Sequence, residues 1–244
     1  MQYEEASRID WQKTKVALNG RYHIIEGSKF YPNEFKQVLK YHAPGLAPVK
    51  DETGWYHIDL SGKAVYSQKY TRTFGYYEGR ASVIQDKKWF HIDPDGVRVY
   101  NESYDWSGNF QYGACPVRKD GKYFHIDTQG DSLYEQQYLY AGDFKDEYAV
   151  VRSANGCTHI DHNGDFLHSQ YFSELDIFHK GYARALDDKG WFHIDSAGSE
   201  IYSTRFGSVE PFYNGYAYAI TLQGTRCIIS ESGEIIHRIG VDER

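Results

Sequence analysis

Short runs rich in aromatic and other apolar residues, separated by glycine-containing turns, occupy most of the chain. In residues 181–203, three such runs follow one another, with turns expected near 188–190 and 196–198. Glycine suits these turns because it tolerates the positive φ that tight hairpins require. Residues 204–214 add a fourth short run and a loop. Aromatic-rich runs joined by glycine turns are typical of β-strands, so the pattern predicts small antiparallel sheets.

The pattern recurs every 34 residues. Its clearest mark is the triplet His-Ile-Asp, and the same spacing reaches one related position at each end of the chain. The seven units are centred on His23, His57, His91, His125, His159, His193 and Cys227. In the central units a glycine follows the histidine after five residues, and a tyrosine follows after nine, with His168 as the exception. Self-similarity at a fixed period is the signature of a repeat protein.

The central strand of a unit needs cover on both faces. In one unit, Trp191 lies on one face while Phe192 and Ile194 lie on the other. Sheets that stack radially as a propeller, or linearly as a solenoid, provide such cover. Seven equal units favour an all-β, seven-bladed β-propeller, with residues 1–244 as a single β-repeat domain. The alternative is an open β-repeat solenoid or superhelix, which the degenerate first and last units favour.

One unit, Trp89-Phe90-His91-Ile92-Asp93 with Gly96 after it, resembles the bacterial WG-repeat family, whose units carry Trp-Gly-Tyr-Ile-Asp at this place. The resemblance covers roughly residues 13–240. Here an aromatic residue replaces the glycine and histidine replaces the tyrosine, which indicates a variant subfamily with a His-Ile-Asp motif. The resemblance implies a β-repeat interaction module, sometimes attached to other domains such as enzymes, and it supplies no catalytic residue.

Composition limits the classes of function. A net charge of −7 argues against a broad nucleic-acid-binding surface, although a local basic patch stays open. No apolar run approaches the roughly 18 residues of a membrane span, and the first residues lack the apolar core of a secretory signal. Three widely spaced cysteines fit neither a disulfide framework nor a zinc site. We therefore expect a cytoplasmic protein that binds neither nucleic acid nor membrane and holds no metal or cofactor.

The repeated His and Asp residues are interpreted as structural, because an enzyme needs one asymmetric set of groups rather than five equal ones. A buried imidazole without a partner would cost about 1–3 kcal/mol, so each must be hydrogen-bonded. The partner can be the Asp, a Tyr hydroxyl or a backbone carbonyl. The structural set is His57, Asp59, His91, Asp93, His125, Asp127, His159, Asp161, His193 and Asp195. We expect no catalytic residue.

Positions that are the same in every repeat are expected to support the fold, so functional residues are expected where the repeats differ. The residue fifteen positions after the central histidine varies most, and nearby loops add further aromatic residues. The predicted partner-binding residues are Arg72, Trp106, Tyr140, Glu174, Tyr112 and Tyr213. The first hypothesis is a noncatalytic module that binds a protein partner or an adjoining domain. The alternative is a multivalent, lectin-like binder of glycans or small molecules, and ordinary exposed loop residues would also give this pattern.

Overall fold

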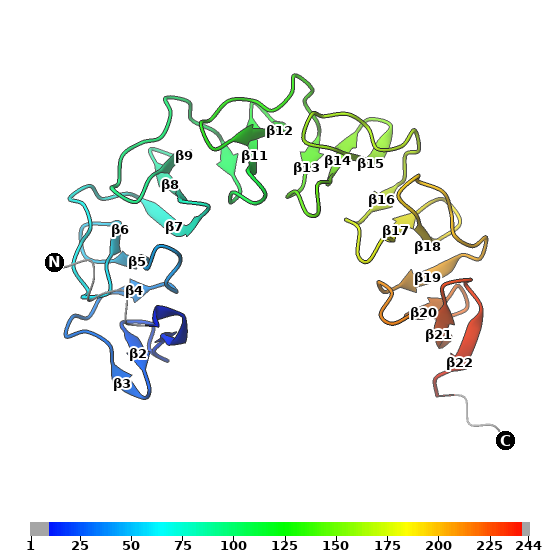
Figure 1. The fold of residues 1–244 in the computed structure, drawn as a ribbon, viewed down its shortest axis with the longest axis horizontal. Coiled ribbons are helices and arrows are strands. Elements are labelled where there is room, and N and C mark those ends of the chain that lie inside the picture. Colours follow the sequence, from blue (N-terminus) through cyan, green and yellow to red (C-terminus); the bar gives the residue numbers. More distant parts are fainter. Residues whose placement is uncertain (1–9, 241–244) are drawn as a thin grey trace. The chain divides into compact units, whose positions relative to one another are not determined.

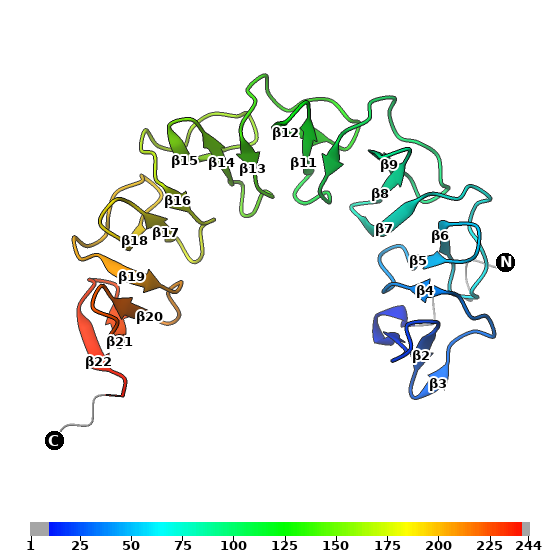
Figure 2. The same cartoon turned by 180° about the vertical axis from the view of Figure 1, so that it is seen from behind.

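The computed structural model describes residues 10–240, so residues 1–9 and 241–244 of the predicted domain lie outside the described residues. The described chain consists of β-strands and one short 3-10 helix, η1 (Trp11–Lys13). It divides into two compact units. The first holds the chain up to Gly121 together with Ile126–Ser132, and the second holds Lys122–His125 and the chain from Leu133 onward. Within each unit, consecutive sheets follow one another in chain order (Figures 1 and 2).

Small antiparallel sheets make up the first unit. Three sheets have the orders β1-β2-β3, β4-β5-β6 and β7-β8-β9, and a fourth, β10-β11-β12, ends on the strand where the two units meet in the sequence. The strands are β1 (Lys15–Val16), β2 (His23–Ile25), β3 (Ser28–Lys29), β4 (Gln37–Val38), β5 (Ala47–Lys50), β6 (Trp55–Ile58), β7 (Arg72–Tyr77), β8 (Arg80–Gln85), β9 (Lys88–Ile92), β10 (Trp106–Ser107), β11 (Ala114–Lys119) and β12 (Lys122–Asp127).

The second unit continues the same plan. It contains the sheet β13-β14-β15 and a seven-stranded sheet in sequential order from β16 to β22. The larger sheet arises because β18 also pairs with β19, through Trp191 and Phe206. The strands are β13 (Tyr140–Ala141), β14 (Ala149–Ser153), β15 (Gly156–Ile160), β16 (Glu174–Leu175), β17 (Ala183–Leu186), β18 (Trp191–Ile194), β19 (Phe206–Val209), β20 (Tyr216–Thr221), β21 (Arg226–Ser230) and β22 (Ile235–Arg238).

The seven repeat centres fall on equivalent strands. They lie on β2, β6, β9, β12, β15, β18 and β21, each of which follows a hairpin partner earlier in its sheet. The run after the Asp is mostly reduced to isolated bridges, such as Ile92 with Arg98, and it forms a strand only in β3 and β22. The prediction of an all-β repeat protein is confirmed. Closure of the repeats into a ring stays a prediction.

The repeated aspartate holds the turn that follows its strand. In one unit, the backbone N–H groups of Asp95 and Val97 donate to Asp93 Oδ1 at 3.0 and 2.8 Å. The equivalent carboxylates of Asp59, Asp127, Asp161 and Asp195 accept the same pair of amide bonds. This Asx-turn explains why Asp recurs two residues after the histidine.

The central histidine joins its own sheet to the next one. His125 Nε2 lies 2.7 Å from the carbonyl oxygen of Gly142, and Nδ1 lies 2.5 Å from the hydroxyl of Tyr134. Because a carbonyl can only accept, Nε2 carries the proton and the tyrosine donates to Nδ1. Four further histidines bond through Nε2 to a carbonyl 16 or 17 residues later: His23, His57, His159 and His193. His91 has a backbone bond to Gly108, 17 residues later, and its Nε2 also lies 3.8 Å from Cys115 Sγ. The imidazole is therefore satisfied on both sides.

Glycine and tyrosine form the second contact between successive repeats. At Gly164 the backbone has a φ of +81°, and an added Cβ would lie 2.7 Å from the Tyr134 ring of the preceding repeat. The same approach occurs between Gly96 and Tyr66 and between Gly233 and Tyr202. Glycine is therefore required here both for its conformation and for its lack of a side chain.

Candidate binding surface

The structure places the predicted binding residues at two opposite ends of the sheets. Arg72, Trp106, Tyr140 and Glu174 each begin the first strand of a three-stranded repeat. Tyr112 and Tyr213 lie at the hairpin that ends that strand. A strand of six residues such as β7 spans roughly 17–20 Å, so the two groups do not form one site.

Cross-strand pairing extends the first group into rows of three residues. In the first unit, Gln37 pairs with Lys50, which pairs with Trp55. The next sheets add the rows that run from Arg72 through Ile84 to Trp89 and from Trp106 to Arg118. We name six of these residues the basic–aromatic row: Lys50, Trp55, Arg72, Trp89, Trp106 and Arg118. The six positions carry three cations and three tryptophans and no carboxylate, and Trp55 is buried.

Arg72 is held between aromatic rings. Its guanidinium carbon lies 4.0 Å from the ring centroid of Trp55 and 5.5 Å from that of Phe74, which in turn stacks on Trp89 at 5.1 Å. Burial lowers the pKa of the Arg72 guanidinium, and within residues 10–240 no carboxylate forms an ion pair with it. The side chain is thus partly desolvated without a compensating anion, although cation–π contact stabilises it.

In the second unit, different residues stand at the two repeat positions that Lys50 and Arg72 occupy in the first unit. Arg152 occupies the position of Lys50, and Glu174 occupies the position of Arg72. The two side chains form an ion pair of 2.7 Å, and Arg152 also donates to the carbonyl of Ser173 at 3.3 Å. Where the first unit has two cations, the second therefore has an internal salt bridge.

The hairpin-end tyrosines form a second exposed feature, in the second unit. The backbone N–H groups of Tyr213 and Tyr216 each donate to the carbonyl of the other residue across the turn, and the two residues are 59% and 52% exposed. His179 lies 4.8 Å from Tyr213 between ring centroids. Tyr112 in the first unit is 54% exposed but is itself a turn residue with a φ of 54°, so it is not equivalent to Tyr213.

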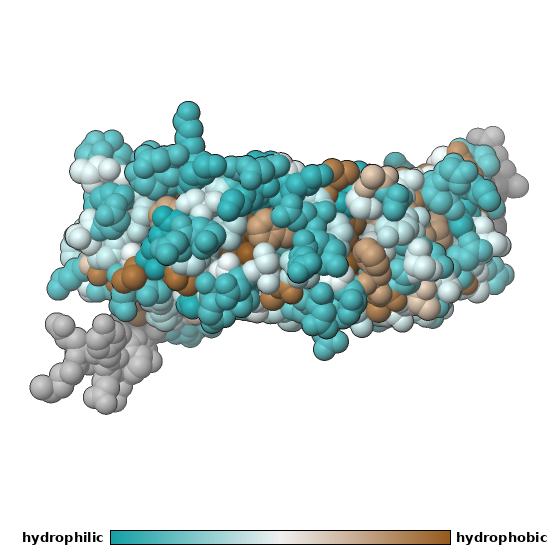
Figure 3. Space-filling view, turned by 90° about the horizontal axis from the view of Figure 1, so that it is seen from above, coloured by the Kyte–Doolittle hydropathy of each residue, from teal (hydrophilic) through white to brown (hydrophobic). Residues whose placement is uncertain are grey.

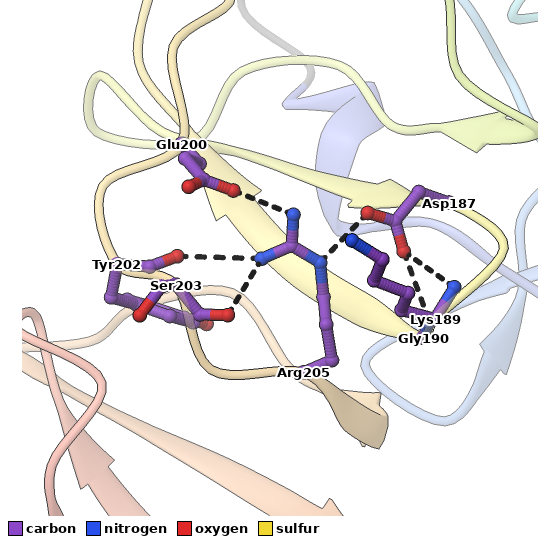
Figure 4. Close-up of polar contacts among 7 residues, drawn as sticks. All are labelled: Asp187, Lys189, Gly190, Glu200, Tyr202, Ser203 and Arg205. Carbon is purple, nitrogen blue, oxygen red and sulfur yellow. Dashed lines mark hydrogen bonds and ion pairs between the residues drawn. The ribbon is translucent and has the colours of Figure 1, made fainter.

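A pocket of about 430 Å³ lies beside Arg205 in the second unit, but Arg205 already has partners within the chain. Arg205 donates to Asp187 at 2.8 Å and to Glu200 at 2.6 Å, and it lies 3.6 Å over the ring of Phe192. Figure 4 shows these carboxylates, with the carbonyls of Tyr202 and Ser203, surrounding the guanidinium. This arginine stabilises its loop, which distinguishes it from Arg72.

Other chemistry is sparse in the described chain. Residues 10–240 contain no group of three or more His, Cys, Asp or Glu side chains placed to hold a metal ion. The three cysteines are buried and form no disulfide within the described residues. Within the same residues, no helix has the length and apolar character to cross a membrane. On the face drawn in Figure 3, hydrophilic residues predominate and hydrophobic ones lie between them in small patches.

Comparison with known families agrees with the repeat. A family model described as "WG containing repeat" matches residues 58–89, 103–123 and 191–220. The chain therefore contains WG repeats at these three places. In its WG repeats, the matched segments include β7, β8 and the residues of β18, β19 and β20. No curated protein sequence matches the chain.

Several solved structures are similar to this chain at low sequence identity. The computationally designed Ika8 protein has 13% identity and a TM-score of 0.48, over 92% of this chain and 82% of its own. BamB from Moraxella catarrhalis has 12% identity and a TM-score of 0.47, over 95% and 88%. Hsv2 from Kluyveromyces lactis has 7% identity and a TM-score of 0.44, over 77% and 71%.

Sequence reasoning missed part of the basic–aromatic row. It singled out Arg72 and Trp106, but not Lys50, Trp55, Trp89 or Arg118, because their proximity depends on strand pairing. The 34-residue spacing held the missing signal, since Lys50 and Arg152 occupy the same place in their repeats. Tyr216 was also missed, although Tyr148 and Tyr182 precede it at the same spacing.

Proposed function

We propose that this WG-repeat chain is a noncatalytic module that binds a protein partner, or an adjoining domain, through the basic–aromatic row. The observation that carries the proposal is the guanidinium of Arg72, which lies between Trp55 and Phe74 without a carboxylate partner in the described chain. Tryptophan and arginine are the residues most enriched in interface hot spots. The buried histidines are used in the scaffold, which supports a role without catalysis.

The scaffold gives this row a rigid support. Each tryptophan or arginine of the row lies at or next to the end of a strand, and histidine and glycine contacts join the sheets of successive repeats. A preorganised surface loses less conformational entropy on binding, so it favours affinity. Three cysteines that form no disulfide in the described chain are compatible with a reducing compartment, and the proposal places the module in the cytoplasm.

Panning a random peptide library against the whole chain tests the proposal. We expect recovered peptides to bind the variants Trp89→Ala and Trp106→Ala at least about tenfold more weakly, as for hot-spot residues. Trp191→Ala is the matched control, because Trp191 occupies the position of Trp89 in a repeat outside the row. Equal affinity for all four proteins would contradict a binding site at the row.

The hairpin-end tyrosines favour a second candidate, binding of a glycan. Tyr213 and Tyr216 present two half-exposed rings side by side, and a sugar can stack on such rings. A glycan array probed with the wild type, Tyr213→Ala and Tyr112→Ala tests this candidate. Glycan signals that fall in Tyr213→Ala and persist in Tyr112→Ala would support it, and signals unchanged by both variants would contradict it.

A further inference from the structure

Two cations of the first unit occupy the positions of an ion pair in the second unit. Lys50 and Arg72 stand in their repeats where Arg152 and Glu174 stand in theirs. Arg152 and Glu174 are joined at 2.7 Å. Among the described residues, neither Lys50 nor Arg72 forms an ion pair. The first unit therefore lacks the carboxylate that neutralises this place in the second.

We infer that Lys50 and Arg72 form a subsite for a carboxylate of an acidic segment in the protein partner. The inference rests on the proposed function and names the chemistry that the row recognises. In the inferred complex, an Asp or Glu side chain of the partner takes the place that Glu174 occupies within the chain. The second unit is closed to such a segment at this position, because its own carboxylate is already bound to Arg152.

The geometry around Arg72 favours a carboxylate. A planar guanidinium matches the two oxygens of a carboxylate, and charge-assisted bonds of this kind are about twice as strong as neutral ones. The rings of Trp55 and Phe74 exclude water from the faces of the guanidinium, which leaves its N–H edge for the anion. Partial burial of a cation also increases its attraction for an opposite charge.

Aromatic residues beside the subsite define the rest of the segment. Phe74 and Trp89 stack at an interplanar angle of 16°, and both are partly exposed. Their exposed rings can contact apolar side chains that flank the carboxylate, as hot-spot tryptophans do. The favoured ligand is thus an extended segment in which Asp or Glu alternates with apolar residues.

A pair of synthetic peptides tests the inference on the whole chain. One acetylated peptide alternates Glu with Leu, and its counterpart replaces each Glu by Gln. We expect the wild type to bind the Glu peptide at least about tenfold more tightly, with affinity that falls as salt is raised. No preference for Glu over Gln would overturn the inference, and so would tighter binding of a phosphoserine peptide of equal net charge.

Charge-reversal variants locate the subsite. Arg72→Glu places a carboxylate opposite Lys50, as Glu174 stands opposite Arg152, so the fold should be retained and the preference for the Glu peptide lost. Lys50→Glu should have the same effect through a carboxylate opposite Arg72. Lys63→Glu is the matched control, because Lys63 is exposed and lies outside the row. A folded Arg72→Glu or Lys50→Glu protein that keeps the preference would overturn the inference.

The result separates this inference from the proposed function. Peptides from the random library that need Trp89 and Trp106 but contain no enrichment in Asp or Glu would overturn the carboxylate subsite and leave the binding module in place. Loss of both the library signal and the Glu preference would overturn both. Enrichment of acidic peptides that lose affinity in Arg72→Glu would support both.

Discussion

Each central histidine makes three contacts with defined roles. The imidazole of His193 accepts from Tyr202 at 2.5 Å in its own repeat, and its Nε2–H donates to the carbonyl of Glu210 at 3.0 Å in the next. Its ring also packs on Phe212, with centroids 4.1 Å apart. A hydrophobic residue of similar size would keep only the ring contact and would leave the partly buried carbonyl without this bond. This explains why histidine recurs at the position.

One repeat departs from this arrangement, and restoring the usual tyrosine there is predicted to stabilise the protein. His168 replaces the usual tyrosine, so His159 Nδ1 meets His168 Nε2 at 3.1 Å, while the buried Nδ1 of His168 makes no well-formed hydrogen bond. His168→Tyr should raise the free energy of unfolding by about 1 kcal/mol, because it removes an unpaired nitrogen. Urea unfolding measures the change. The reciprocal control, Tyr134→His, should lower stability, and a stabilised control would contradict the explanation.

Two glycines with similar φ should differ in how much stability the protein loses when each is replaced by alanine. Gly164 has a φ of +81° and faces the Tyr134 ring, whereas Gly181 has a φ of +87° with nothing within 4 Å of an added Cβ. Gly181→Ala should cost about 1–2 kcal/mol through the left-handed conformation alone. Gly164→Ala should cost clearly more, because the ring must also move. Equal losses in urea unfolding would show that the ring contact between repeats contributes little.

In five of the repeats, the first hairpin is a two-residue turn with positive φ at both positions. In most repeats glycine is second, as in Lys180–Gly181 and Asn214–Gly215 of the second unit. One turn instead has Glu147 at a φ of 75° after Asp146. A type I′ turn has positive φ at both central residues, and it is favoured in hairpins because its twist matches the twist of the two strands. The hairpin therefore holds Glu147 in a conformation that suits glycine better.

Replacing Glu147 should therefore stabilise this element. Glu147→Gly is expected to raise the free energy of unfolding by up to about 1 kcal/mol, since it removes the steric cost of the left-handed conformation. Thermal and urea unfolding measure the gain. Gly215→Glu, in the equivalent turn two repeats later, should produce a loss of similar size. A destabilised Glu147→Gly protein would show that its side chain contributes more than the turn conformation costs.

Much of this element structure could be predicted from the sequence. The 34-residue period located the seven central strands, and glycine located the hairpins, because both depend on local spacing. The sequence did not separate Tyr112 from Tyr213, since one residue of offset decides which is in the turn. It also did not distinguish Asp from Tyr as the partner of histidine, because Asp93 and Tyr100 are both close along the chain. The place of Arg72 beside Trp55 depends on the contact between neighbouring sheets, which spacing alone does not give.

At the scale of the whole molecule, the same junction joins one repeat to the next. Six histidines each bond to a carbonyl in the following sheet, and six glycines face an aromatic ring of the preceding repeat. In repeat proteins, stability is approximately the sum of the units and their nearest-neighbour interfaces. A condition that weakens every junction in the same way therefore affects the entire chain at once.

Acid is such a condition, because the junctions need neutral imidazole. Burial lowers the pKa of His57, His91, His125, His159 and His193 to about 4 from the usual 6.5, although the bond from Nε2 to a carbonyl opposes the shift. Between these two values, the unfolded chain binds protons that the folded chain excludes. Stability is therefore full above pH 6.5 and is lost as the pH falls toward 4, by up to about 1.4 kcal/mol per pH unit for each histidine.

Five such groups acting together should make acid unfolding begin well above pH 4, because the net stability of a folded protein is only about 5–15 kcal/mol. We expect the urea midpoint to fall steeply between pH 6.5 and 5, with uptake of several protons on unfolding. Urea titrations followed by circular dichroism measure this change. They are run at pH 7.5, 6.5, 5.5 and 4.5, in steps of about one pH unit across the range in which the histidines titrate. Carboxylates with lowered pKa, such as Asp51, lose their contribution only below their usual value of 3.8, so they cannot produce the same window. A midpoint that stays constant down to pH 5 would contradict the role of neutral histidine at every junction.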